Sequence, residues 1–257
     1  MHWHLLVSPA LSGPENMALD EALLRRAQRT GDAVCRVYTW REPTLSFGRN
    51  QTARGHYDAG LARELGVAVV RRPTGGRAVL HHRELTYSVT APLRDAEPLR
   101  ESYGRVNRLL LDALRALGVD ARLAERGGRA PVPSAAPCFE APTVGELVLD
   151  GRKLAGSAQW RDEGAFLQHG SILVDDDQAL VPRLALHPVP VPAAPATLRA
   201  ALGRAPTADE LGAALLLAIR AREDAAAARW DGLEPALRLD AEQACQRYRD
   251  DHWTWRR

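Results

Sequence analysis

Apolar residues recur every three or four positions in several stretches of the chain, which is the spacing of one face of an α-helix. The clearest stretch is residues 106–117, which Gly118 closes as a C-terminal cap. Residues 12–29 start with a Ser-Gly-Pro turn, carry acidic residues early and arginines late, and also favour a helix. The same spacing predicts helices over residues 58–65, from near Thr207 onward, and over residues 240–248.

Short runs of β-branched and aromatic residues, bounded by turn residues, predict strands. These runs are residues 3–7, 35–40, 44–48, 67–72, 77–81, 85–90, 146–149, 152–160 and 166–174. Residues 35–40 and 44–48 are separated by Arg-Glu-Pro, so we expect a hairpin or strand pair there. Because strands follow strands rather than alternating with helices, we expect an α+β fold: a mixed, largely antiparallel sheet flanked by helices.

Two proline-rich stretches interrupt this pattern. A loop as long as residues 127–142 is usually either functional or disordered, and residues 187–195 form an extended connector. We expect residues 1–186 to form the catalytic domain, and residues 187–257 to be a connector and helical completion of the same domain, too short for an independent one. Trp253 and Trp255 predict a short strand or a packed end.

Charge and cysteine content narrow the class of protein. The net charge is +2 and no run of five basic residues occurs, which argues against a nucleic-acid partner. Cys35, Cys138 and Cys245 are odd in number and widely spaced, which favours a reducing compartment over a disulfide framework, and their spacing suits no zinc site. No secretion signal and no membrane span is predicted, so we expect a cytoplasmic protein without membrane contact.

All but one of the 34 basic side chains are arginines, and the exception is Lys153. Arginine stays charged, whereas lysine is a compact ammonium whose pKa the environment can move. Because the other basic positions are all arginine, the single lysine indicates that position 153 requires an ammonium. The alternative is that this lysine survived by chance on a solvated turn. Small residues follow at 155–158, so an apolar ligand would fit along this strand, with the ammonium holding a carbonyl oxygen or lowering the pKa of a thiol.

Three further features suggest chemistry. Gly75 and Gly76 would expose backbone N–H groups to a carboxylate, a phosphate or an acyl carbonyl, or form a plain turn; the pattern is not a Walker loop. His169, on the next predicted strand, either faces the same space as residues 155–158 or is a structural histidine. Cys138 is the only cysteine outside a predicted helix or strand, and is either a nucleophile paired with Lys153 or an ordinary loop cysteine.

Five motifs resemble, in order, the landmarks of the biotin/lipoate protein ligase superfamily. They are NMALDEALL at 16–24, RRPTGGRAVLH at 71–81, ELTYSV at 84–89, CFEAP at 138–142, and GRKLAGSAQ at 151–159 followed by LQHGSIL at 167–173. Within the superfamily, the chain is most similar to the cysteine-dependent octanoyltransferases of lipoate biosynthesis. The resemblance implies transfer of an octanoyl group from octanoyl-acyl carrier protein to a lysine of a lipoyl domain, such as the glycine-cleavage H protein, without a cofactor or a metal.

The resemblance also implies roles for individual residues. Cys138 falls on the acyl-thioester nucleophile, and Lys153 on the lysine that lowers the pKa of that thiol and holds the acyl carbonyl. The implied substrate-binding residues are Arg71, Arg72, Thr74, Gly75, Gly76, Arg77, His81, Gly156, Ser157, Ala158, His169 and Gly170. The implied mechanism has two steps, in which the Cys138 thiolate attacks the carrier thioester and the acceptor lysine then attacks the acyl-enzyme. Either backbone N–H groups of the glycine loop or the Lys153 ammonium would stabilise the oxyanion.

Two departures separate the chain from ATP-dependent lipoate ligases. Arg77 stands where such ligases commonly have a third glycine, and only residues 196–257 follow the connector, where many ligases carry an accessory domain. Both favour a transferase over an ATP-dependent lipoate or octanoate ligase. An amidotransferase between lipoyl domains would also use a cysteine and is a third alternative. A non-catalytic acyl-protein binder would need neither the lysine nor the loop cysteine.

Overall fold

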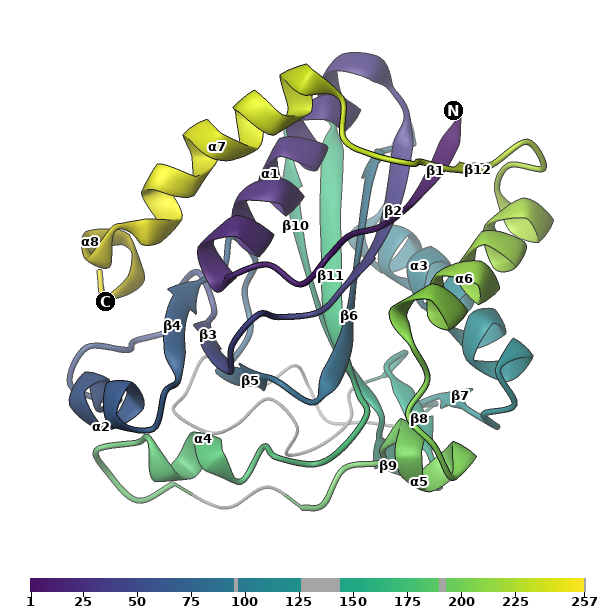
Figure 1. The fold of residues 1–257 in the computed structure, drawn as a ribbon. Coiled ribbons are helices and arrows are strands. Elements are labelled where there is room, and N and C mark those ends of the chain that lie inside the picture. The colour runs from purple at the N-terminus through teal and green to yellow at the C-terminus, as the bar shows by residue number, and fades with distance from the viewer. Residues whose placement is uncertain (95–96, 126–143, 190–192, 257) are drawn as a thin grey trace.

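A six-stranded sheet runs through the centre of the computed structural model, which describes residues 1–94, 97–125, 144–189 and 193–256 (Figure 1). The strand order is β10-β11-β6-β2-β1-β12. The strands are β1 (Trp3–Val7), β2 (Ala33–Tyr38), β6 (Glu84–Pro92), β10 (Ala155–Asp162), β11 (Ala165–Leu173) and β12 (Ala228–Arg229). Strands β10, β11, β6 and β2 pair antiparallel, whereas β1 pairs parallel with β2 and β12. This mixed, mostly antiparallel sheet confirms the predicted fold class.

Strand β3 (Thr44–Phe47) belongs to a second sheet, in which it pairs parallel with β4 (Ala68–Arg71) and antiparallel with β5 (Val79–His81). The expected hairpin of residues 35–40 with 44–48 is therefore wrong. Its physical reason is that both edges of β2 are already occupied, one by β1 and the other by β6. The chain after β2 turns away from the sheet, where the Arg41 N–H donates to the Leu11 carbonyl at 2.9 Å.

The strand predicted over residues 152–160 divides into two strands at Leu154. Strand β9 (Arg152–Lys153) joins β7 (Arg122–Leu123) and β8 (Leu147–Leu149) in a third sheet, whereas β10 enters the central sheet. Leu154 is fully buried, and it donates to the Leu147 carbonyl and accepts from the Leu173 N–H. Lys153 and the small residues after it therefore lie in neighbouring sheets.

Helices cover both faces of the central sheet (Figure 1). Helices α1 (Gly13–Thr30) and α7 (Pro235–Arg249) lie over one face, and α3 (Leu99–Ala116) and α6 (Ala208–Arg222) over the other. Successive strand residues point to opposite faces, so Leu6 packs with α1 whereas Leu5 packs with α3 and α6. The short helices are α2 (Ala59–Glu64), α4 (Leu180–Arg183), α5 (Leu198–Leu202) and α8 (Asp251–Thr254). Within the described part of the chain, no helix combines the length and apolar character that crossing a bilayer requires.

The C-terminal helices connect α1 to the second sheet. Helix α7 packs along α1, where the Tyr248 hydroxyl donates to the buried Glu21 carboxylate at 2.6 Å. Trp253 and Trp255, for which the sequence predicts a short strand or a packed end, do not form a strand. Trp253 lies in the single turn of helix α8, and Trp255 directly follows that helix. From there the Trp253 indole donates to the Arg71 carbonyl at 2.9 Å, and the Arg71 Nε donates to the Thr254 carbonyl at 2.9 Å. The C-terminal segment thus braces the start of the glycine loop.

Candidate active site

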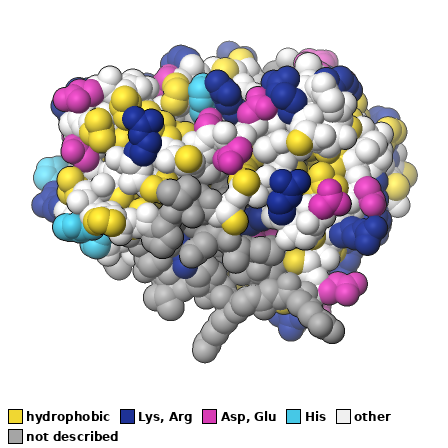
Figure 2. Space-filling view, turned by 90° about the horizontal axis from the view of Figure 1, so that it is seen from below, with side chains coloured by type: hydrophobic (Ala, Val, Ile, Leu, Met, Phe, Trp, Pro, Cys, Tyr) yellow, Lys and Arg dark blue, Asp and Glu magenta, His cyan; other side chains and the backbone are white. Residues whose placement is uncertain are grey.

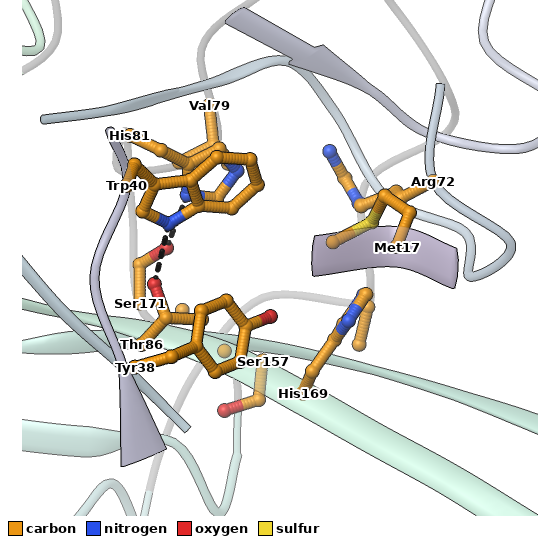
Figure 3. A pocket seen from close by; sticks show the side chains of 14 residues that line it. Met17, Tyr38, Trp40, Arg72, Val79, His81, Thr86, Ser157, His169 and Ser171 are labelled. Atoms are coloured by element: carbon orange, nitrogen blue, oxygen red, sulfur yellow. Dashed lines mark hydrogen bonds between the residues drawn. The ribbon is translucent and has the colours of Figure 1, made fainter. Parts of the chain in front are cut away.

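A narrow cavity of about 40 Å³ lies between the glycine loop, the two strands β10 and β11, helix α1 and the end of β2 (Figure 3). Its lining residues come from six separate parts of the chain. They are Met17, Tyr38, Trp40, Arg72, Gly76, Val79, His81, Thr86, Gly156, Ser157, Ala158, His169, Gly170 and Ser171. Eight of the twelve substrate-binding residues implied by the sequence are among them, so the structure brings together the glycine loop and the small-residue strand.

Glycine is required at two places where backbones meet closely. A Cβ on Gly170 would lie 2.4 Å from the Gly156 carbonyl oxygen and 2.7 Å from the Ser157 Oγ. A Cβ on Gly48, a residue that the sequence did not single out, would lie 2.0 Å from the Gly76 carbonyl oxygen. Because real contacts of this kind are longer, the glycines allow the walls of the cavity to approach one another.

The remaining four implied residues lie outside the cavity lining and support the loop. Arg71 is fully buried and points away, donating to the carbonyl oxygens of Gly48 at 2.6 Å and Gln51 at 2.7 Å. Arg72 holds the loop from inside, because its Nη2 donates to the carbonyls of Gly75 at 3.0 Å and Arg77 at 2.6 Å. Gly75 and Arg77 thus contribute their carbonyls to this contact.

The fourth of these residues, Thr74, is anchored to a buried histidine and carboxylate. Its Oγ1 lies 2.7 Å from the Nε2 of His169, whose Nδ1 lies 3.1 Å from the Asp20 Oδ2. Burial raises the pKa of Asp20, but hydrogen bonding by His169 and the charge of Arg36 outweigh it and leave that pKa below its usual value. Burial lowers the pKa of His169 more than Asp20 raises it. The ring is therefore neutral at pH 7, donates from Nδ1 to Asp20, and accepts the Thr74 hydroxyl at Nε2.

A second histidine and carboxylate occupy the opposite wall of the cavity. The His81 Nδ1 lies 2.8 Å from the Glu84 Oε1, and its Nε2 lies 2.7 Å from the Ser46 Oγ. Trp40 stacks on the His81 ring with centroids 4.0 Å apart, and its indole donates to the Thr86 Oγ1 at 2.7 Å (Figure 3). Thr86 in turn donates to Glu84, so this one buried carboxylate orients the His81 ring directly and the Trp40 indole through Thr86.

In each of these two groups a hydroxyl, an imidazole and a carboxylate lie in hydrogen-bonded order, as they do in a nucleophilic triad. One group is Thr74, His169 and Asp20, and the other is Ser46, His81 and Glu84. Thr74 and Ser46 are nevertheless fully buried, and neither belongs to the cavity lining. A substrate carbonyl in the cavity would therefore meet the histidine rings and not these hydroxyls. The two groups act as supports that fix the glycine loop and the aromatic wall to the central sheet.

Lys153 lies beyond the cavity lining, three residues before Gly156. Its side chain is buried, and its Nζ lies 3.0 Å from the Glu146 carboxylate. The alternative of a lysine on a solvated turn is therefore wrong. Cys138 lies outside the described residues, so its pairing with Lys153 stays a prediction.

Sequence reasoning missed the acidic supports Asp20, Glu84 and Glu146. The helix dipole explains an acidic residue early in α1, but it does not explain why Asp20 is fully buried. A signal was present: Asn16 and Asp20 are four residues apart, so they share a helix face with the apolar residues of α1. Polar residues on a buried helix face need buried partners, and Arg36, which donates to both side chains, is that partner.

Comparison with known proteins identifies the class. Residues 12–220 match the family described as lipoyl protein ligase A/B catalytic domain, and the chain belongs to this family, as the resemblance predicted. The fold is also that of a solved bi-partite lipoate protein ligase from Thermoplasma acidophilum, with a TM-score of 0.80 at 22% identity over 99% of this chain and 96% of that one.

More similar in sequence are curated proteins named Octanoyltransferase LipM. The protein of Carboxydothermus hydrogenoformans is 45% identical over 179 residues, which are 68% of this chain and 66% of that protein. The protein of Anoxybacillus flavithermus is 42% identical over 195 residues, which are 72% of this chain and 70% of that protein. The relatives are acyltransferases, which confirms the predicted enzyme class.

Proposed function

We propose that the chain transfers an octanoyl group from octanoyl-acyl carrier protein to the acceptor lysine of a lipoyl domain, through a thioester on Cys138. The observation that carries this proposal is the narrow cavity between the glycine loop and strands β10 and β11, in a chain whose curated relatives are octanoyltransferases. Met17, Trp40 and Val79 give the cavity apolar walls, and the small residues of β10 leave room along the backbone, which suits an unbranched acyl chain.

The proposed reaction has two acyl-transfer steps. In the first, the Cys138 thiolate attacks the thioester carbonyl of the carrier, a new thioester forms, and the carrier thiolate leaves and takes up a proton. In the second, the neutral amine of the acceptor lysine attacks the acyl-enzyme, an amide forms, the nitrogen loses a proton, and Cys138 leaves as a thiolate. Negative charge develops on the carbonyl oxygen in both steps, and we assign its stabilisation to the ammonium of Lys153.

The deciding experiment compares two acyl donors. We expect octanoyl-acyl carrier protein without ATP to modify a lipoyl domain, and free octanoate with ATP to leave it unmodified. Robust ATP-dependent modification from the free acid would instead indicate a ligase, and transfer only from an octanoylated lipoyl domain an amidotransferase. Mass spectrometry of the enzyme with octanoyl carrier protein should show an octanoyl adduct that Cys138→Ser abolishes; an undiminished adduct refutes the nucleophile.

The same proposal covers organisation and location. We infer that residues 187–257 complete the domain formed by residues 1–186, because β12 pairs with β1 and α7 packs along α1. A cytoplasmic location is in keeping with Cys35 and Cys245, which are both free and buried. The proposed partners are the acyl carrier protein and the lipoyl domain, with neither nucleic acid nor membrane.

A further inference from the structure

The proposed reaction uses the ammonium of Lys153 but gives no role to Glu146, with which Lys153 forms an ion pair. Lys153 is 5% exposed and Glu146 is 6% exposed, and the two carboxylate oxygens of Glu146 both lie 3.0 Å from the Lys153 Nζ. A surface ion pair contributes little, but a buried ammonium that loses a carboxylate loses part of what compensates for its lost hydration. Burial by itself favours the neutral amine of a lysine. A carboxylate at this distance favours the ammonium.

The backbone around Glu146 is held firmly in place. Glu146 directly precedes β8, and the β8–β9 hairpin places Val148 opposite Lys153, so Glu146 lies at the start of the strand that pairs with the strand of Lys153. The Glu146 carbonyl accepts from the Ala124 N–H at 2.8 Å. The carbonyl of the preceding Gly145 accepts from the Asn107 side chain at 2.7 Å. Glu146 therefore has a fixed position from which to orient the ammonium.

A chain of buried and partly buried hydrogen bonds connects this position to the wall of the cavity. On the cavity side, the Tyr87 hydroxyl donates to the Ser157 Oγ at 2.7 Å and accepts from the Gln168 Nε2 at 3.1 Å. Gln168 also donates to the Asn107 Oδ1 at 2.9 Å, and Asn107 holds Gly145. Buried polar chains of this kind fix relative positions. The ion pair and the acyl-binding strand are thus parts of one rigid arrangement.

We propose that Glu146 is a positioning residue that keeps the Lys153 side chain protonated and directed for acyl transfer. The inference rests on the proposed function, because it assigns the ammonium to the reacting carbonyl. In the resting protein the pair is neutral overall, so the ammonium can respond to negative charge that appears during the reaction. Without Glu146, the neutral amine is favoured more strongly by burial, so a larger share of the protein loses the ammonium at alkaline pH and that response weakens.

The test uses the fact that Lys153 is the only lysine. Full-length protein labelled with ¹³C-lysine gives a single Cε resonance, whose chemical shift reports the protonation of this side chain without any activity. In the wild type we expect the ammonium signal to persist through pH 9. In Glu146→Gln we expect the titration midpoint to fall by about one pH unit or more, with Glu146→Asp between the two. Glu101→Gln, which removes a charge from the exposed face of α3, is the matched control and should not move the signal.

Transfer kinetics over pH give the second readout. We expect the kcat of Glu146→Gln to approach that of the wild type at pH 6 and to fall at least about twofold below it at pH 9, where a midpoint lowered by one unit leaves half or less of the lysine protonated, with the KM for octanoyl carrier protein unchanged. A role limited to folding would instead give a defect that is the same at every pH and follows the loss of thermal stability. Equal titration midpoints in Glu146→Gln and the wild type would overturn the proposal.

Two outcomes are kept apart by this design. If Glu146→Gln does not fold, the wild-type titration still decides, because a Lys153 signal that loses its proton below pH 8 contradicts the proposed role of Glu146. If Cys138→Ser retains the octanoyl adduct, the proposed mechanism fails, while the lysine titration still reports on Glu146 alone.

Discussion

The contact between Gly48 and Gly76 predicts a sharp difference between two glycine-to-alanine substitutions in the same site. A Cβ added at Gly48 lies 2.0 Å from the Gly76 carbonyl oxygen and 2.8 Å from its carbonyl carbon, and these backbone atoms cannot rotate away. In Gly75→Ala, the added Cβ meets no atom within 4 Å. Both changes add one methyl group to the loop region, but only the first forces the backbone to move.

The size of the movement sets the expected effect. To reach an ordinary contact, the Gly76 carbonyl has to move by roughly 1 Å, and a displacement of that size near reacting groups can cost about 10²-fold in rate. The same movement stretches the hydrogen bonds from Arg72 to the carbonyls of Gly75 and Arg77. Overpacking of this kind typically lowers the free energy of unfolding by about 1–3 kcal/mol.

The assay is kcat/KM for octanoyl transfer, together with urea unfolding followed by circular dichroism. We expect Gly48→Ala to lose about 10²-fold in kcat/KM and to unfold at lower urea, while Gly75→Ala remains within twofold of the wild type. Wild-type behaviour of Gly48→Ala would show that the loop adapts freely, and an equal loss in both variants would show that the contact has no special role.

Three further predictions concern other contacts. Trp253→Phe removes the indole that donates to the Arg71 carbonyl but keeps an aromatic ring, and should lower the free energy of unfolding by about 1 kcal/mol in urea titrations; no change would show that α8 does not brace the loop. Lys153→Arg should lose roughly 10²-fold in kcat despite its charge, because a planar guanidinium does not replace a compact ammonium beside Glu146, and a near-normal rate would make the single lysine an accident. Burial lowers the pKa of His169 below 6.5, so as the pH falls the unfolded chain takes up a proton on this residue before the folded chain does. His169 therefore contributes stability that is complete above pH 6.5 and is lost as the pH falls toward its folded pKa. Urea midpoints between pH 5 and 8 should show this slope in the wild type and a smaller slope in His169→Gln; equal slopes would contradict a neutral His169.

The sequence predicted local elements more fully than their partners in space. The periodicity over residues 106–117 and the small residues after Lys153 depend only on neighbours along the chain, and α3 and β10 follow from them. The placement of β3 in a second sheet depends on which strand edges are free once the chain has folded. No local pattern contains that information, so the expected hairpin with β2 was wrong.

The same distinction applies to the site. The RRPTGG motif marked the glycine loop, but it did not separate Arg72, which lines the cavity, from Arg71, which faces the C-terminal helix. Adjacent strand residues point in opposite directions, and only the packing on each side decides which of them meets the ligand. The roles of Asp20 and Glu84 were missed for a related reason, because each carboxylate acts through a histidine. His169 is adjacent to Asp20 only in the folded chain, and His81, the partner of Glu84, is part of another motif.

The solitary lysine has a consequence for the enzyme's own surface. In the proposed mechanism the chain carries a thioester intended for a lysine amine, and any lysine near it on the same chain would compete at the high effective concentration of an intramolecular group. The only lysine is Lys153, which is 5% exposed, and the other basic side chains are arginines, whose guanidinium groups stay protonated and are poor acyl acceptors. An octanoyl group carried by such a chain therefore meets no exposed lysine of the same chain that could react with it, and it stays available to the acceptor lysine of the lipoyl domain.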